Sequence, residues 1–162
     1  MNPASDLGNL TVVEVALGHP DTVTAEHWLG SLAVAPVLAC THLVRTPSPQ
    51  VALTLGFDGE LPDLPGSSPA TLSRSSGRAV LYPGVEALTG TLTVADILTL
   101  SIIEHVEVLG SGPASPESLV DTDNFVRPQW WAGSLVLTTT PAAGGLLVPF
   151  ETRNPTPCCA AH

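Results

Sequence analysis

Short hydrophobic segments recur along this chain, and clusters of proline, glycine, serine and aspartate separate them. Runs of valine, leucine, isoleucine and threonine are typical of β-strands, and the separating clusters are typical of turns. Residues 10–17 form the first predicted strand. Apolar side chains alternate in residues 37–44 and 51–57, which predicts a hairpin across 46–49. The pattern predicts an all-β fold, a single-domain antiparallel β-barrel or sandwich of about seven to eight strands.

Two segments lack a clear strand pattern. Residues 23–35 can form a short helix that Pro36 would end, or they can be irregular, and both interpretations stay open. Residues 58–70 contain three prolines and two glycines. Such a composition predicts a lid or rim loop rather than a strand or a helix.

The later segments complete the predicted domain. Residues 125–131 and 134–140 are predicted to be strands joined around 132–133. No internal repeat and no linker divides the chain. One β domain is therefore predicted for residues 1–151, followed by a tail, 152–162, that contains proline and cysteine.

One apolar run, residues 91–109, is too long for an ordinary strand and is expected to bend or break near 95–96. In its second half the even positions are aliphatic except for Glu104, so a strand would place this carboxylate on the apolar side. A helical stripe that starts after a Thr93 cap is the alternative. Nine β-branched residues in this run favour the strand.

Glu104 is the first candidate for catalysis. A carboxyl group among aliphatic side chains is desolvated, and such groups can act as general acids or bases near neutral pH. The alternative is a carboxylate at a strand end that reaches Arg74, Arg78 or solvent. Asp96 is the second candidate, although an aspartate at a strand break more often belongs to a turn.

Aromatic residues are scarce, since the chain has three tryptophans, one tyrosine and three phenylalanines. Trp28, Tyr82, Trp130 and Trp131 are therefore the candidates for the wall of a ligand cavity. On a strand, Trp130 and Trp131 would face opposite ways. The favoured alternative is one tryptophan in the core and one at an interface.

Two short motifs place cysteine near histidine: Cys40-Thr-His42, and Cys158-Cys159-Ala-Ala-His162 at the end of the sequence. Cys40 and His42 would share a strand face, and a tail that crosses this strand could complete a four-ligand zinc site. The favoured alternative is a buried, unreactive Cys40 and a frayed tail. No cofactor other than this alternative zinc is expected.

Charge narrows the range of partners. The chain has fifteen acidic residues, five arginines and no lysine, and its formal net charge is −10. Such a surface repels nucleic acid and anionic lipid, and no apolar run approaches the roughly 20 residues that a membrane-spanning helix needs. Neither a nucleic acid nor a membrane is expected as a partner. The sequence begins without a secretory-signal pattern, so a cytoplasmic location is expected.

Three functions follow as hypotheses. The favoured one is the binding of a hydrophobic small molecule in an apolar cavity, with cofactor-free isomerisation, cyclisation or dehydration by Glu104 and Asp96 as its catalytic form. The second is a zinc-binding protein built on the cysteine and histidine motifs. The third is a homo-oligomeric structural or interaction module with an exposed tryptophan. Motifs of serine hydrolases, phosphate-binding loops and zinc proteases are absent from the sequence.

Overall fold

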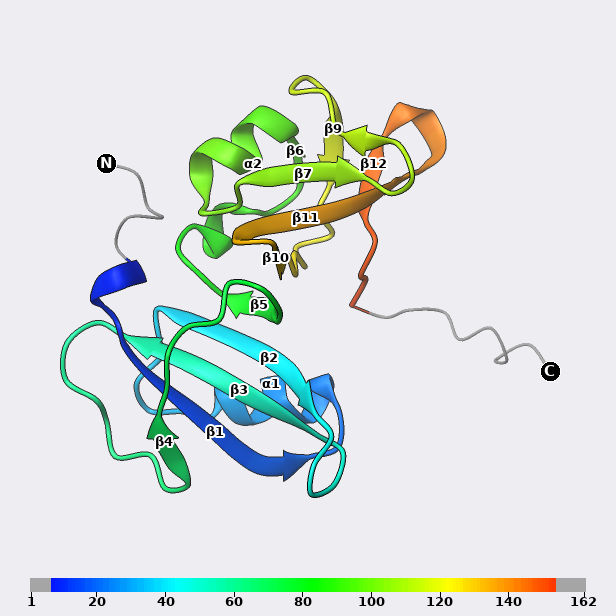
Figure 1. Cartoon of the computed structure of the whole chain (residues 1–162). Helices are drawn as coiled ribbons and strands as arrows, with labels where there is room; N and C mark the ends of the chain where they lie inside the picture. The colour runs from blue at the N-terminus through cyan, green and yellow to red at the C-terminus, as the bar shows by residue number, and fades with distance from the viewer. Residues whose placement is uncertain (1–6, 154–162) are drawn as a thin grey trace.

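The computed structural model describes residues 7–153, and twelve strands in this part of the chain form one sheet (Figure 1). The elements are, in chain order, β1 (Thr11–His19), α1 (Thr22–Gly30), β2 (Leu38–Val44), β3 (Gln50–Phe57), β4 (Ser67–Pro69), β5 (Arg78–Leu81), the 3-10 helix η2 (Val85–Ala87), β6 (Thr91–Thr93), α2 (Val94–Leu100), β7 (His105–Val108), β8 (Gly112–Pro113), β9 (Leu119–Asp121), β10 (Gln129–Trp131), β11 (Ser134–Pro141), the 3-10 helix η3 (Ala143–Gly145) and β12 (Leu147–Pro149). Within this described range no helix has the length and apolar character that crossing a membrane requires.

The strands follow the order β4-β1-β3-β2-β5-β10-β11-β12-β9-β6 across the sheet, and β7 and β8 extend it from β11. Neighbours are antiparallel except for two parallel pairs, β7 with β11 and β9 with β12. The prediction of a mostly β domain is confirmed. The sheet is not closed, however, and it has more strands than predicted. Several of them contain only two or three residues, which is too short for an alternating pattern to appear.

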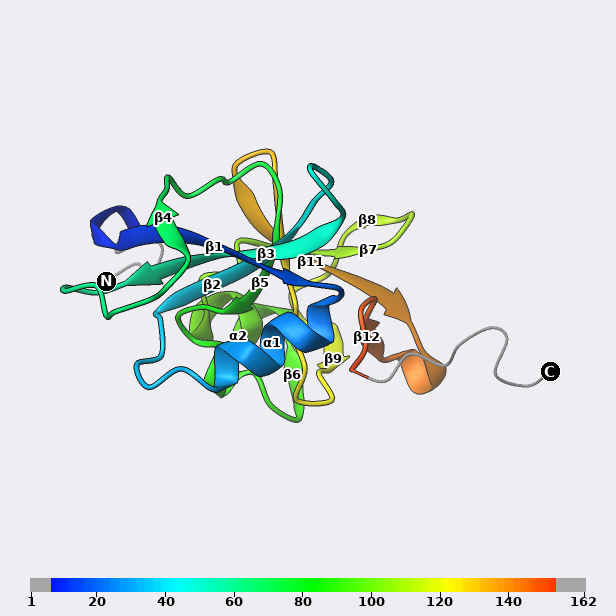
Figure 2. The same cartoon turned by 90° about the horizontal axis from the view of Figure 1, so that it is seen from below.

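The predicted hairpin of residues 37–57 is confirmed, because β2 and β3 pair in a continuous antiparallel register. β1 pairs with the other edge of β3, and α1 packs on one face of these strands (Figure 2). Ala25 and Leu29 of α1 join a buried cluster that includes Leu53 and Leu55 of β3. Burying a leucine side chain stabilises a fold by about 2 kcal/mol, so this cluster fixes α1 on the sheet.

The short helix predicted near residues 23–35 is confirmed as α1. It begins after Asp21 because the Asp21 carboxylate accepts a hydrogen bond of 2.7 Å from the backbone N–H of Thr24. The helix ends at Gly30, so Pro36 does not end it.

A second buried cluster lies among α2 and the strands of the C-terminal half. It includes Tyr82, Ile97, Trp130 and Leu135. The Tyr82 hydroxyl donates a hydrogen bond of 2.9 Å to the carbonyl oxygen of Val126. The polar end of this buried ring therefore has a partner, as burial of a tyrosine requires.

The run of residues 91–109 divides into β6, α2 and β7. The favoured strand prediction is wrong for residues 94–100, where the alternative of a helix after a Thr93 cap is confirmed. The Thr93 hydroxyl accepts a hydrogen bond of 3.1 Å from the backbone N–H of Asp96 and caps α2. Ile97 on the inner side of α2 is completely buried. A cap together with the burial of one helical face outweighs the strand preference of β-branched residues.

The predicted hairpin around residues 132–133 is also confirmed, since β10 and β11 pair with Trp131 opposite Ser134. Ala132 has a φ angle of 48° and Gly133 one of 91°. A two-residue type I′ turn requires positive φ at both positions. Alanine in this left-handed region is strained by about 1 kcal/mol.

An Ala132→Asn substitution is expected to raise the free energy of unfolding by about 0.5–1 kcal/mol, because asparagine tolerates positive φ and Asn-Gly suits type I′ turns. Urea unfolding measures this change. Ala33→Asn is the matched control, since Ala33 is also exposed but is not among the residues with positive φ. Equal effects of the two substitutions would contradict the strain assigned to Ala132.

Candidate functional site

Glu104 and Asp96, the predicted proton-transfer residues, are both exposed. Glu104 lies just before β7, and its backbone N–H donates a hydrogen bond of 2.9 Å to the carbonyl oxygen of Leu135. Asp96 lies in the first turn of α2. The prediction that Glu104 faces the core is wrong, because the alternation on which it depended is interrupted by α2 and the turn that follows. Neither carboxylate lines any of the three pockets described below.

The four aromatic residues predicted to line a cavity do not share one. Tyr82 and Trp130 are buried, and Trp28 is half-buried beside His19, with 5.8 Å between the ring centroids. Trp131 is 73% exposed. None of the four lines the three pockets. Trp130 in the core and Trp131 at the surface match the alternative that the sequence favoured, and an oligomer formed through Trp131 stays a prediction.

Cys40 and His42 line the same small pocket of about 110 Å³, as their shared strand face predicted. Burial raises the pKa of the Cys40 thiol to about 11, so this thiol is protonated and poorly reactive near neutral pH. Among residues 7–153 no group of three or more histidine, cysteine or acidic side chains is placed to hold a metal ion. The other predicted ligands, Cys158, Cys159 and His162, lie outside the described residues, so the alternative zinc site stays a prediction.

A larger pocket of about 800 Å³ lies beside α1, where this helix faces the C-terminal part of the described chain. We call it the α1 cleft. Its walls come from the first turns of α1, the start of β5, the segment that leads into β10 and the segment that follows β12. The lining residues are Thr22, Val23, Glu26, Arg78, Phe125, Arg127, Gln129, Phe150, Glu151, Thr152 and Arg153.

The sheet register explains why side chains from separate strands meet at this cleft. Thr41 of β2 pairs with Arg78 of β5, and Arg78 pairs with Gln129 of β10. Cross-strand partners point to the same face of a sheet. Thr41 also pairs with Leu53, whose side chain belongs to the cluster under α1. Arg78 and Gln129 therefore lie on the face that α1 covers, and they line the cleft beside the helix.

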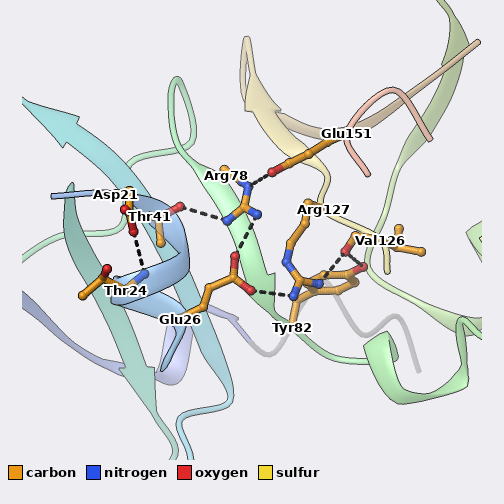
Figure 3. A network of polar contacts seen from close by, with 9 residues as sticks. All are labelled: Asp21, Thr24, Glu26, Thr41, Arg78, Tyr82, Val126, Arg127 and Glu151. Atoms are coloured by element: carbon orange, nitrogen blue, oxygen red, sulfur yellow. Dashed lines mark hydrogen bonds and ion pairs between the residues drawn. The ribbon is translucent and has the colours of Figure 1, made fainter. Parts of the chain in front are cut away.

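Glu26 of α1 bridges two arginines from the opposite wall of the cleft (Figure 3). Its Oε2 atom lies 2.8 Å from Nη2 of Arg78, and its Oε1 atom lies 2.6 Å from Nη2 of Arg127. Nε of Arg78 also donates a hydrogen bond to Oε1 of Glu151. The Glu26, Arg78 and Arg127 side chains are only 20%, 12% and 14% exposed. The network is thus shielded from solvent and connects α1 to the C-terminal part of the sheet.

The charge state of Glu26 follows from these contacts. Burial alone would raise the pKa of Glu26, but the hydrogen bonds and positive charges of Arg127 and Arg78 together outweigh burial and hold the pKa below its ordinary value of 4.5. Glu26 is therefore ionised at neutral pH. It acts as a counter-ion for the two arginines rather than as a proton donor.

Apolar side chains form the rim of the α1 cleft. Val23 is 75% exposed and Phe150 is 62% exposed. The Phe125 ring contacts the guanidinium group of Arg127, whose Cζ atom lies 4.0 Å from the ring centroid. An exposed apolar rim around charged groups is typical of a binding surface.

Two buried polar atoms of the cleft lack partners, and one arginine has no counter-ion. Nε of Arg127 and Oε2 of Glu151 are buried without a hydrogen-bond partner in the described part of the chain. Arg153 is exposed, and its Nη2 atom donates a hydrogen bond of 2.8 Å to the carbonyl oxygen of Asn124, but within residues 7–153 it forms no ion pair. Buried polar atoms without partners are rare in folded proteins, and they often mark places where water, an ion or a ligand completes the arrangement.

The sequence hypotheses missed this cleft because its residues lie far apart along the chain. Glu26 and Arg127 are separated by 101 positions, and Arg78 and Glu151 by 73. No local motif connects them. The one signal in the sequence is the small number of basic residues, because the chain has five arginines and no lysine. Three of those arginines line the α1 cleft.

Comparison of the chain with protein-family models, with curated proteins and with solved structures finds no match in any of the three. The proposals below therefore depend on the geometry and chemistry of the cleft.

Proposed function

We propose that the protein binds a small organic molecule that combines an apolar part with an anionic group, and that this ligand occupies the α1 cleft. The observation that carries the proposal is the gathering of Arg78, Arg127 and Arg153 at one pocket, in a chain whose formal net charge is −10. Arginines on an acidic protein create a local positive potential that attracts and orients an anion.

The size and lining of the cleft support this proposal. Its volume of about 800 Å³ falls in the range of small-molecule sites, about 300–1,000 Å³. Val23, Phe125 and Phe150 offer apolar contacts to the body of a ligand. The sequence analysis expected an apolar cavity, whereas the site proposed here is a cleft with an apolar rim and charged walls.

The charges in the cleft favour an anion over a cation. Glu26 and Glu151 form ion pairs with Arg78 and Arg127. With Arg153, the cleft has three guanidinium groups and two carboxylates. Arg153 is the remaining positive charge. An anionic group near Arg153 would form a charge-assisted hydrogen bond of the kind that arginine makes with carboxylates and sulfonates.

Binding, not turnover, is the function that these residues support. The proton-transfer hypothesis required a carboxyl group that is desolvated by burial, whereas Glu104 and Asp96 are both exposed. Glu26 is ionised and paired. The proposal therefore contains no reaction.

Two fluorescent probes test the proposal. 8-Anilinonaphthalene-1-sulfonate has an apolar body and an anionic group, and N-phenyl-1-naphthylamine has the same body without the sulfonate. The protein is expected to bind the sulfonate more tightly. Arg153→Gln should weaken sulfonate binding by about five-fold, the effect of one exposed ion pair, and should leave the neutral probe unaffected.

Two further variants complete this test. Phe150→Ala should weaken both probes, because both bodies lose the same aromatic contact. Arg45→Gln is the charge-matched control, since Arg45 is exposed and lines none of the three pockets. If Arg45→Gln weakens sulfonate binding as much as Arg153→Gln does, the anion is attracted by overall charge and the proposed site is wrong.

A further inference from the structure

A second pocket, of about 580 Å³, adjoins the α1 cleft. The two pockets share Thr22, Arg78 and Gln129 as a common wall. Beyond this wall the second pocket is lined by Leu43 and Val51, which pair across β2 and β3. Because the two pockets adjoin along this wall, we describe them together as one groove beside the first residues of α1.

Asp21 and Arg153 bring opposite charges to the two parts of this groove. Asp21 lines the second pocket, and the hydrogen bond from the Thr24 backbone N–H holds the pKa of Asp21 below its ordinary value of 3.8, so its carboxylate is charged at neutral pH. Arg153 lines the α1 cleft but not the second pocket. A ligand that carries a cation at one end and an anion at the other is complementary to this pair of charges.

The middle of the groove offers hydrogen-bonding side chains. The Thr22 hydroxyl and the Gln129 amide can each donate and accept, and both belong to the wall that the pockets share. A peptide backbone presents N–H donors and C=O acceptors in regular alternation, and each needs a partner. Apolar side chains line each pocket outside the shared wall, with Leu43 57% exposed in the second pocket and Phe150 62% exposed in the α1 cleft.

We infer that the groove binds a short free peptide, with its α-carboxylate at Arg153 and its α-ammonium group at Asp21. Apolar terminal side chains of the peptide lie against Phe150 at one end and Leu43 at the other. The inference rests on the proposed function of the α1 cleft and extends it by naming the ligand class. Because both termini are recognised, the ligand is a free peptide and not the C-terminal end of a larger protein.

Calorimetric titration of the full chain with the tetrapeptide Leu-Gly-Gly-Phe tests the inference, together with its N-acetylated and its C-amidated forms. Each blocked form is expected to bind about five-fold more weakly than the free peptide, because each loses one ion pair. Asp21→Asn should weaken the free peptide but not the acetylated one. Asparagine still caps α1, so the helix is retained. Arg153→Gln should weaken the free peptide but not the amidated one.

The controls are Asp58→Asn and Arg45→Gln, which change the same charges at exposed positions outside the three pockets. The inference is overturned if acetylation leaves the affinity unchanged, because the second pocket then recognises no ammonium group. It is also overturned if the naphthalene sulfonate binds and no form of the peptide does, an outcome that leaves the proposed function intact. If neither probe binds, both proposals are wrong.

Discussion

Gly84→Ala is expected to lower the free energy of unfolding by about 4 kcal/mol, through overpacking and backbone strain together. Gly84 has a φ angle of 93°, in a region that alanine adopts only with strain. A Cβ atom at this position would lie 2.1 Å from the carbonyl oxygen of Leu100 and 2.5 Å from the Cα atom of Ser101. Because both neighbours are backbone atoms, the end of α2 would have to move.

Urea unfolding followed by circular dichroism measures this loss. Gly110→Ala is the matched control, since Gly110 also has a positive φ, 78°, but a Cβ atom there would meet nothing within 4 Å. Its expected cost is the backbone strain alone, about 1 kcal/mol. If the two variants lose the same stability, the close contact between Gly84 and the end of α2 does not exist.

Glu26→Gln is expected to destabilise the protein by about 2–3 kcal/mol, which lowers the melting temperature by roughly 5–10 °C. The glutamine keeps the size of the side chain but removes the charge that Arg78 and Arg127 share. Arg78 retains Glu151, whereas Arg127 loses its one carboxylate partner within residues 7–153. A partly buried guanidinium without a counter-ion accounts for most of the loss.

The effect of Glu26→Gln should depend on pH in a defined direction. Because the pKa of Glu26 is lower in the folded protein than its ordinary 4.5, the unfolded chain binds the proton more readily. The stabilising contribution is therefore complete above about pH 4.5 and is lost as the pH falls through the folded-state pKa. Thermal unfolding of the variant and the wild type should differ most at neutral pH and converge in acid.

Glu86→Gln is the control for this comparison, because Glu86 is exposed and forms no ion pair in the described part of the chain. Its melting temperature is expected to stay within about 1–2 °C of the wild type at all pH values. A pH-independent effect of Glu26→Gln would mean that the carboxylate does not stabilise the arginines as described.

Local patterns in the sequence predicted the elements whose partners lie close in the chain. The hairpin of β2 and β3 follows from alternation on both sides of a proline-rich turn, and the hairpin of β10 and β11 follows from the Gly133 turn. The run 91–109 carries both a strand pattern and a helical stripe after Thr93, and the burial of Ile97 favours the helix at residues 94–100. Burial depends on distant segments, and no property of the run itself reveals it.

The candidate site was the least predictable part of the molecule. Alternation placed Glu104 in the core, but it is exposed, because the strand begins only at His105. The residues that do gather, Glu26, Arg78 and Arg127, come from a helix, a strand and a loop that only the sheet order brings together. The register of β2, β5 and β10 that places Arg78 at the cleft is a property of long-range pairing, which single-sequence patterns do not encode.

The most direct test of ligand binding in the α1 cleft is a ¹H–¹⁵N nuclear magnetic resonance titration of the labelled full chain with 8-anilinonaphthalene-1-sulfonate. The backbone amides of Val23, Gln129, Phe150 and Arg153 are expected to shift together and to saturate with one ligand per chain, while the amides around Glu104 stay unchanged. Shifts confined to another surface, such as the exposed Trp131 hairpin, or no saturable shifts at all would contradict the proposal.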